Sequence, residues 1–313
     1  MHALVAGGAG LIGSAMCARL LERGDRVVCV DNLVTGSAAN VEHLIGDRGL
    51  TLLEADICQP LALPPGVRLD AVINLACPAS PVDFEHLSLE IMETGSRGVA
   101  NLLDLARDHG ARFLQASTSE VYGDPVCHPQ PETYWGNVNP VGPRSVYDEA
   151  KRFGEALTMA HHRRFGTAVR IARIFNTYGP RMRADDGRVV SNFVTQALRG
   201  APLTIYGDGS QTRSFCFVDD EVEGLLALLE SGHPGPMNIG TDEEMTVRTL
   251  AEMVIGLTGS RSEIVEVDLP VDDPVRRRPD LTLARSILGW QPTTSLEDGL
   301  ASTIGWFRDR LPY

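Results

Sequence analysis

The feature that most constrains the fold of this chain is a glycine-rich turn close to its start. Gly7, Gly10 and Gly13 follow an apolar run at residues 4–6 and precede a stretch with helical periodicity. Between a strand and a helix, glycines at these positions permit a tight turn, let backbone N–H groups approach a pyrophosphate and allow the helix to pack on the strand. The turn therefore predicts a dinucleotide-binding α/β unit; the alternative is a plain turn.

An acidic residue after the second apolar run supports this interpretation. Asp31 stands where a carboxylate accepts hydrogen bonds from the adenosine ribose, and it disfavours the extra phosphate of NADP, so NAD is the expected cofactor. Asp56, after the third run, either reaches the adenine edge or caps a turn. The predicted cofactor contacts are Gly7, Gly10, Leu11, Ile12, Gly13, Asp31, Asn32, Thr35, Gly36, Asp56, Ile57, Leu75, Ala76, Tyr147 and Lys151.

Short apolar runs alternate with helical stretches through the first half of the chain. Continuous apolar runs are typical of parallel strands that are buried on both faces. The predicted strands are 4–6, 27–30, 51–53, 71–75, 112–116 and 169–174, and the main predicted helices are 12–22, 91–107 and 145–164. This pattern predicts an α/β protein: a Rossmann-type doubly wound parallel sheet in residues 1–180. Residues 181–313 are expected to form mainly a smaller substrate-binding α/β lobe, with some segments returning to the first domain.

Composition narrows the classes of partner. The 313 residues include 41 acidic and 28 basic side chains, a net charge of −13, so binding to nucleic acid or to an anionic membrane surface is not expected. An anionic substrate must then be held by local arginines. The chain begins without a signal-peptide pattern and has no apolar run near the roughly 20 residues of a membrane span. We expect a cytoplasmic protein whose six scattered cysteines are reduced and bind no metal.

A tyrosine and a lysine four residues apart form the candidate catalytic pair. Tyr147 and Lys151 share one face of a predicted helix, and an ammonium beside a phenol stabilises the phenolate and lowers its pKa. The phenolate removes a proton from a sugar hydroxyl while NAD accepts the hydride. Thr118, just beyond the fifth predicted strand, lies at the sheet edge expected for the nicotinamide. The alternative for Tyr147 and Lys151 is an exposed pair on a helix surface.

With these motifs in this order, the whole chain resembles the extended short-chain dehydrogenase/reductase family, and within it the UDP-glucuronate decarboxylases, or UDP-xylose synthases. Seven stretches carry the resemblance. They are 76–81 (ACPASP), 117–125 (STSEVYGDP), 128–151 (HPQPETYWGNVNPVGPRSVYDEAK), 171–182 (IARIFNTYGPRM), 187–193 (GRVVSNF), 209–215 (GSQTRSF) and 272–280 (DDPVRRRPD).

The resemblance implies roles for individual residues. It implies that Tyr147 and Lys151 act in oxidation and that Thr118 and Ser119 form hydrogen bonds near the sugar. It also implies that Glu120 and Arg277 serve decarboxylation. Oxidation at C4 makes a ketone β to the C5 carboxylate. When CO₂ is lost, this ketone accepts the electrons that remain. Protonation at C5 and return of the hydride to C4 then give UDP-xylose. The implied contacts of the UDP-sugar substrate are Pro78, Ser119, Asn176, Arg183, Arg188, Val189, Asn192, Tyr206 near the uracil, Arg213 and Arg277.

Two departures from the decarboxylase pattern keep an alternative open. Glu93 and Gly95 stand where those enzymes usually carry lysine and asparagine, so Glu93 is expected to weaken binding of a carboxylate-bearing substrate unless another cation substitutes. Arg183 could supply that cation, and it looks like the carboxylate-binding arginine of UDP-glucuronate 4-epimerases.

Three other expectations follow. A 4,6-dehydratase is disfavoured because Ser119 stands where that class carries an aspartate. The non-enzymatic alternative is a NAD-binding sensor or scaffold, which intact Tyr147 and Lys151 disfavour. The resemblance also implies a homodimer formed through helices 91–107 and 145–164, although both could simply cover the sheet.

Overall fold

The chain is built around one large parallel sheet. The computed structural model describes residues 1–46, 49–268 and 276–311. The seven strands of the sheet run in the order β11-β6-β5-β4-β1-β2-β3, and each hydrogen-bonds its neighbour in parallel. Their bounds are β1 His2–Ala6, β2 Arg26–Asp31, β3 Leu50–Glu54, β4 Ala71–Asn74, β5 Arg112–Thr118, β6 Val169–Ile174 and β11 Met237–Ile239. All six predicted strands are confirmed, and β11 is an addition.

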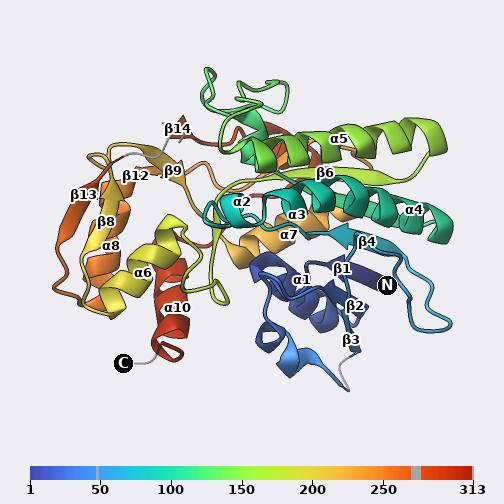
Figure 1. Cartoon of the computed structure of the whole chain (residues 1–313), viewed down its shortest axis with the longest axis horizontal. Helices are drawn as coiled ribbons and strands as arrows, with labels where there is room; N and C mark the ends of the chain where they lie inside the picture. Colours follow the sequence, from blue (N-terminus) through green and yellow to red (C-terminus); the bar gives the residue numbers. More distant parts are fainter. Residues whose placement is uncertain (47–48, 269–275, 312–313) are drawn as a thin grey trace.

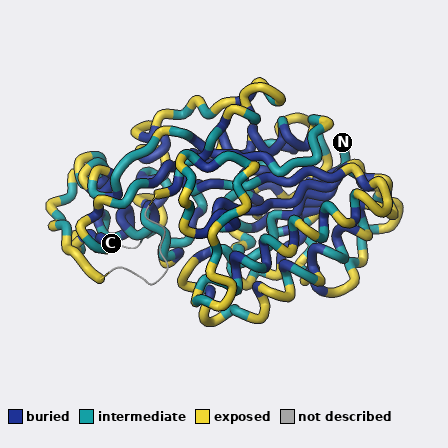
Figure 2. Tube along the Cα trace, turned by 90° about the horizontal axis from the view of Figure 1, so that it is seen from above, coloured by how far each residue is buried: buried dark blue, intermediate teal, exposed yellow. Residues whose placement is uncertain are grey.

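Side chains alternate between the two faces of this sheet. Leu4 and Val28 belong to one buried cluster, whereas Val5 and Cys29 belong to the other. Helix α4 (Val99–His109) packs on the first face, and helices α1 (Leu11–Glu22) and α7 (Val218–Glu230) pack on the second (Figure 1). The sheet is thus covered on both faces, and its strands are the most continuously buried part of the chain (Figure 2).

A second group of shorter elements lies beside the sheet (Figure 1). Three small sheets join β7 with β10, β8 with β13, and β9 with both β12 and β14. Their bounds are β7 Thr177–Tyr178, β8 Leu203–Tyr206, β9 Thr212–Ser214, β10 Cys216–Phe217, β12 Glu244–Thr246, β13 Ile264–Val267 and β14 Arg276–Arg277. Helices α6 Val189–Leu198, α8 Val247–Thr258 and α10 Leu296–Arg308 complete this part of the chain, whereas α9 Thr282–Leu288 returns to the large sheet and packs against β11 and α7. No helix in the described ranges combines the length and apolarity needed to cross a bilayer.

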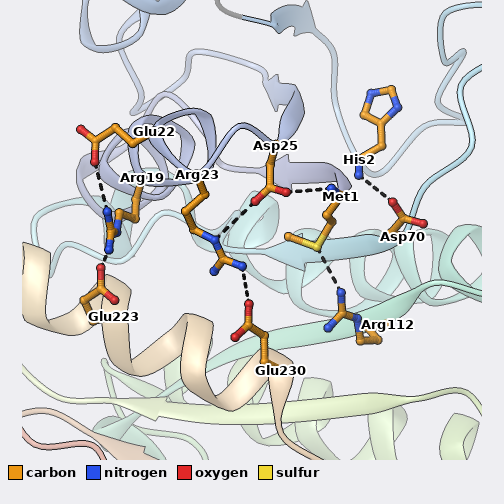
Figure 3. A network of polar contacts seen from close by, with 10 residues as sticks. All are labelled: Met1, His2, Arg19, Glu22, Arg23, Asp25, Asp70, Arg112, Glu223 and Glu230. Atoms are coloured by element: carbon orange, nitrogen blue, oxygen red, sulfur yellow. Dashed lines mark hydrogen bonds and ion pairs between the residues drawn. The ribbon is translucent and has the colours of Figure 1, made fainter.

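Helices α1 and α7 come from distant parts of the sequence and are joined by ion pairs (Figure 3). Arg19 pairs with Glu223, and Arg23 pairs with Glu230. Just beyond the C-terminal end of α1, the N-terminal ammonium group of Met1 forms an ion pair with Asp25 Oδ1 at 2.7 Å. Exposed pairs of this kind contribute only about 0–1 kcal/mol each, so the apolar contacts beneath them hold the helices together.

A helix predicted as one piece over 91–107 is interrupted in the structure. The segment consists of α3 (Ser88–Glu93), a π-helical turn η3 (Thr94–Gly98) and α4. Gly95 lies against helix α5 (Ser145–Phe165), and a Cβ at Gly95 would be 2.7 Å from the Cβ of Ala150. The absent side chain therefore permits the close approach of η3 to the helix that carries Tyr147.

This contact predicts the effect of restoring a side chain. Gly95→Asn is expected to lower the free energy of unfolding by about 1–3 kcal/mol, because overpacking forces neighbouring atoms apart. Thermal and urea unfolding would measure the change. Gly256→Asn is the matched control, since a Cβ there meets no heavy atom within 4 Å. Equal stability of the two variants would contradict the packing assigned to Gly95.

One carboxyl group is fully buried next to the sheet. Glu221 on α7 accepts a hydrogen bond from Thr177 Oγ1 at 3.2 Å, and its other oxygen has no partner among the described residues. Burial raises the pKa of Glu221 to about 8. The folded chain therefore holds this group neutral over a pH range in which the unfolded chain ionises it.

The raised pKa predicts a loss of stability with rising pH. Between about pH 4.5 and pH 8 the folded state binds more protons than the unfolded state at this group, so the free energy of unfolding falls as pH rises. We expect Glu221→Gln to remove most of this decline, which amounts to about 4 kcal/mol between these pH values. Melting temperatures measured across this range would show it. Glu223→Gln, on the exposed side of α7, serves as the control and should retain the wild-type slope.

Candidate active site

A cavity of about 920 Å³ opens where the central strands end. Its wall includes residues that directly follow or terminate β1, β4, β5 and β6, such as Gly7, Leu75, Thr118 and Ile174. In open α/β sheets, ligands bind in the crevice beyond the carboxyl ends of the strands. The volume lies within the range of small-molecule and cofactor sites.

The glycine turn forms one end of this cavity. Gly7 has φ +73°, and a Cβ on it would be 2.7 Å from the nitrogen of Ala76. A Cβ on Gly13 would collide with the carbonyl oxygen of Gly7. Gly10 is the N-cap of α1, so the first N–H groups of that helix are directed toward the cavity side of the turn. These residues fit a pyrophosphate, because a larger residue would occupy the space or disrupt the turn.

Asp31 and Asn40 hold the glycine turn in place. The Ala9 N–H donates to Asp31 Oδ2 at 2.9 Å, the Leu33 N–H donates to Asp31 Oδ1 at 2.9 Å, and Asn40 Nδ2 donates to the Ala9 carbonyl at 2.9 Å. Each carboxylate oxygen can accept a further hydrogen bond. Asp31 thus has acceptor capacity for a ribose hydroxyl while it supports the turn.

The other predicted cofactor residues separate into two groups. The residues that line the cavity are Gly7, Gly10, Leu11, Ile12, Gly13, Thr35, Leu75, Tyr147 and Lys151. The residues outside the cavity wall, in the part of the chain that is described, are Asp31, Asn32, Gly36, Asp56, Ile57 and Ala76. Asp56 Oδ1 accepts a hydrogen bond from the Cys58 N–H at 2.8 Å, so in this structure Asp56 caps a turn, the second of the two roles predicted for it.

Tyr147 and Lys151 lie together at the other end of the cavity, near the last residue of β5, Thr118. The ring of Tyr147 stacks on Phe84 with 5.1 Å between centroids, and Lys151 Nζ lies 5.6 Å from the Tyr147 ring centre. Lys151 Nζ also donates to the Ala116 carbonyl at 3.0 Å. The sequence prediction that the two side chains share one helix face at the strand ends is confirmed.

The predicted lowering of the tyrosine pKa is wrong for this structure. Burial, followed by the neighbouring Cys77 thiol, raises the pKa of Tyr147, whereas Arg188 and a hydrogen bond with Thr118 lower it less. Tyr147 is only 6% exposed. The spacing in sequence gave no indication of this burial, which outweighs the nearby positive charges.

A carboxylate between two arginines lies next to this pair. Glu120, on the short helix η4 (Ser119–Tyr122), forms ion pairs with Arg277 and with Arg144, the latter at 2.8 Å. Burial opposes ionisation of Glu120, but the two arginines outweigh it and lower the pKa of Glu120 to about 2. The structure therefore brings Glu120 and Arg277, 157 positions apart, into direct contact.

Asp148 is a second carboxyl group close to this cluster. It follows Tyr147 on α5 and is buried, and its Oδ1 accepts no hydrogen bond from the described residues. Burial and repulsion by Glu120 raise the pKa of Asp148 to about 7, against the opposing effects of Arg144 and Arg277. Two neighbouring carboxyl groups thus titrate in different pH ranges, Glu120 in strong acid and Asp148 near neutral pH.

The predicted substrate contacts are only partly gathered at the cavity. Ser119, Asn176, Arg183 and Arg188 line it, and Arg277 adjoins it through Glu120. Asn192 instead donates to the Gly187 carbonyl at 3.1 Å, and the Tyr206 side of β8 is exposed. The predicted residues outside the cavity wall, among those described, are Pro78, Val189, Asn192, Tyr206, Arg213 and Arg277. The first residues of the predicted stretch 272–280, as far as 275, lie outside the described residues.

Glu93, which stands where the decarboxylases usually carry a lysine, does not face the substrate cavity as the sequence predicted. Its carboxylate pairs with Arg97 at 2.8 Å on the outer side of α3 and η3, and its side chain is 46% exposed. Glu93 is not part of the described cavity wall. The expectation that it places a negative charge against the substrate is therefore wrong for the structure described here.

Several cavity residues were missed by sequence reasoning. Phe84 stacks on Tyr147, and Arg144 pairs with Glu120 and lies 5.7 Å from the Phe84 ring. Asp83 and Arg181 also line the cavity. The position of Arg144, three residues before Tyr147 in a family stretch, was a usable signal. Phe84 and Asp83 lie in a segment without a motif, so only tertiary contacts identify them.

The sheet, the glycine turn and the Tyr147–Lys151 pair define an extended short-chain dehydrogenase/reductase. A family model described as GDP-mannose 4,6 dehydratase matches residues 4–303. The chain belongs to this family.

Individual relatives cover almost the whole chain. UDP-glucuronic acid decarboxylase 2 from Arabidopsis thaliana is 51% identical over 311 residues, which span 99% of this chain and 69% of the relative. The structure of a dTDP-glucose 4,6-dehydratase from Streptomyces venezuelae, with NAD and TYD bound, has a TM-score of 0.89, 31% identity and coverage of 99% and 98%. A UDP-glucuronic acid 4-epimerase from Bacillus cereus, in complex with UDP-glucuronic acid and NAD, has a TM-score of 0.86, 27% identity and 99% coverage of both chains.

Proposed function

We propose that this protein is a NAD-dependent UDP-glucuronate decarboxylase, which converts UDP-glucuronate to UDP-xylose and CO₂ through a 4-keto sugar. The observation that carries the proposal is Glu120, fixed between Arg144 and Arg277 next to the Thr118–Tyr147–Lys151 group. About 50% identity to decarboxylases over the whole chain supports the same reaction.

The oxidation begins at the C4 hydroxyl of the sugar. Tyr147 accepts the hydroxyl proton, and Thr118 orients the phenol through their hydrogen bond. Lys151 Nζ lies 5.6 Å from the ring centre, and its charge, together with that of the bound nicotinamide, must offset the burial that raises the pKa of Tyr147. Bound NAD accepts the hydride from C4, returns it at the end of the cycle, and adds a positive charge that favours the phenolate further.

The decarboxylation uses the ketone as its electron sink. When the C5–C6 bond breaks, its electron pair moves into an enolate at C4 and C5, and CO₂ leaves. C5 then needs a proton. Glu120, with a pKa of about 2, has none to give in its resting state, so we assign to Glu120 and Arg277 the orientation of a water molecule that protonates C5.

We assign the cavity residues to two ligands. Residues 1–180 provide the NAD site through the glycine turn, Asp31 and the predicted contacts around them. Residues 181–313 supply most of the sugar-nucleotide contacts, with Arg188 in the cavity wall as a cation for the diphosphate. Arg213 and Tyr206 contact the nucleotide in this proposal only if the lobe closes further around it.

Proton NMR of UDP-glucuronate incubated with the enzyme tests the function. UDP-xylose and CO₂ are the expected products, and a catalytic amount of NAD suffices because it is regenerated. Formation of UDP-galacturonate without CO₂ would instead identify a C4 epimerase. An unchanged spectrum with NAD still bound would favour the cofactor-binding sensor or scaffold.

The 4-epimerase is the second candidate, and one observation favours it. Arg183 lies in the cavity wall, where its guanidinium could hold the substrate carboxylate and so retain it. The fold similarity to the Bacillus cereus 4-epimerase is consistent with this reaction. Glu120 between two arginines favours the decarboxylase, because retaining the carboxylate requires no group to assist protonation at C5.

We propose a cytoplasmic homodimer. Support comes from large apolar side chains exposed on the helices named for the dimer, with Met92 41% exposed on α3 and Phe153 51% exposed on α5; Leu89, which precedes the predicted 91–107 helix at the start of α3, is 79% exposed. All six cysteines are free, as expected in a reducing compartment. Light scattering coupled to size exclusion would give the mass, and Leu89→Glu combined with Phe153→Glu should shift a dimer to the monomer.

A further inference from the structure

Two segments from opposite halves of the chain meet at the cavity. Residues 79–84 follow β4, and residues 183–188 follow β7; both segments contribute to the cavity wall. Arg188 Nη2 donates to the Ala79 carbonyl at 3.0 Å, and Ser80 Oγ donates to the Asp186 carbonyl. The two segments are therefore joined side by side.

The strongest link between these segments is an ion pair. Arg183 Nη2 lies 3.1 and 2.9 Å from the two carboxylate oxygens of Asp83. The Asp83 side chain is 14% exposed and that of Arg183 is 30% exposed, so water screens the pair only in part. The nearest other carboxylate, that of Asp185, is 3.9 Å from Arg183 Nε and almost fully exposed.

This ion pair lies close to the reacting end of the cavity. The residue after Asp83 is Phe84, whose ring stacks on Tyr147. A pyranose that presents its C4 hydroxyl to Tyr147 carries its carboxylate on the adjacent carbon, C5. Arg183 thus lies in the same cavity wall as Tyr147, and its partner Asp83 directly precedes the residue whose ring packs on the proposed base.

An arginine on the substrate carboxylate would oppose decarboxylation. The carboxylate group leaves as neutral CO₂, and the electron pair of the C5–C6 bond moves into the enolate, so the negative charge shifts to the former ketone oxygen. A guanidinium bound to the carboxylate stabilises the ground state, and that interaction weakens as the C5–C6 bond breaks. It therefore raises the barrier to CO₂ loss. Asp83 already occupies the guanidinium of Arg183.

We propose that Asp83 determines the outcome of the reaction by holding Arg183 away from the substrate carboxylate, so that the 4-keto sugar loses CO₂. This inference rests on the proposed function. In this role Asp83 is a positioning residue that acts through Arg183. The C4–H hydride and the hydroxyl proton leave as before; Asp83 affects only the next step, in which the C5–C6 pair becomes the enolate and C5 then takes a proton.

The test compares oxidation with CO₂ release in a single turnover. Enzyme with NAD is mixed with UDP-glucuronate that is radiolabelled in its carboxylate, and reduced NAD and released CO₂ are followed together. We expect Asp83→Asn to lower the ratio of the CO₂-release rate to the oxidation rate by about tenfold, because Arg183 can then bind the substrate carboxylate. Carboxylate-bearing products should accumulate in the NMR spectrum.

Two further variants separate this role from a structural one. Asp83→Asn combined with Arg183→Met should restore the ratio, whatever the total turnover, because the interfering cation is gone. Asp242→Asn is the matched control: Asp242 meets Arg285 Nη2 at 3.1 and 3.0 Å in the same geometry, outside the described cavity wall. Its ratio should equal that of the wild type.

Each outcome decides the proposal. A lowered ratio in Asp83→Asn that the second substitution restores supports it. A ratio equal to that of the Asp242→Asn control, or a lowered ratio that the double variant fails to restore, overturns it while the proposed decarboxylase stands. If the wild type oxidises UDP-glucuronate but releases no CO₂, the proposed function itself fails.

Discussion

Replacing Tyr147 by phenylalanine is expected to lower kcat by about 10³-fold or more while NAD remains bound. The substitution removes only the hydroxyl that accepts the C4 proton, and general-base catalysis typically contributes about 10²–10⁴-fold. The stacking on Phe84 uses the ring, which phenylalanine retains. The glycine turn and Asp31 lie at the other end of the cavity, so they should bind NAD as before.

The measurement pairs a rate with a binding constant. UDP-xylose formation gives kcat, and calorimetry gives the affinity for NAD. Tyr134→Phe is the control, since the Tyr134 hydroxyl lies outside the cavity wall, where it accepts the Val126 N–H at 3.2 Å. If Tyr147→Phe turned over at the wild-type rate, Tyr147 would not be the base, and the proposed mechanism would be contradicted.

The second large effect concerns Glu120. Glu120→Gln keeps the shape of the side chain but removes the charge that faces Arg144 and Arg277. We expect CO₂ release to slow by about 10²-fold while C4 oxidation persists, so reduced NAD and the 4-keto sugar accumulate. Because the pKa of Glu120 is about 2, its carboxylate is ionised throughout the neutral range, so titration of Glu120 itself should add no pH dependence to the defect between about pH 5 and 9.

The same substitution has a predictable effect on stability. A carboxyl group with a lowered pKa stabilises the fold above its unfolded pKa of about 4.5, and this contribution is lost as pH falls toward 2. Glu120→Gln should therefore lower the melting temperature at pH 7, and the difference from wild type should shrink in acid. Glu244→Gln, which alters an ion pair with His128 away from the cavity, is the control for activity and should release CO₂ at the wild-type rate. Wild-type CO₂ release by Glu120→Gln would exclude Glu120 from the chemistry.

Local sequence patterns were sufficient for the framework of this protein. Apolar runs located the six strands, because strands buried on both faces require continuous apolar side chains. The glycine spacing located the turn at Gly7 and Gly13, because a side chain at either position would collide with nearby backbone atoms. The Tyr147–Lys151 spacing located the catalytic helix for the same reason: four residues return to one helix face.

Features set by tertiary neighbours could not be predicted in this way. The pKa of Tyr147 depends on burial of the ring, on which Phe84 stacks, and on the electrostatic effect of the Cys77 thiol; both residues are more than 60 positions away in the chain. The ion pair of Arg183 with Asp83 spans 100 positions, and no spacing rule connects them. Glu93 looked like an intruding charge only because its partner, Arg97, and its outward direction were unknown. Strand β11 has three residues, too few for a periodic pattern.

The hydrogen bonds of Asp31 limit how the enzyme could be redesigned for another cofactor. A common strategy for accepting NADP is to exchange the acid at this position for a small or basic residue. Here the same carboxylate receives the Ala9 and Leu33 amides, and Gly36 packs directly against it. Such an exchange would leave two backbone donors without their acceptor and loosen the turn, so a usable variant would have to rebuild the loop as well as the charge.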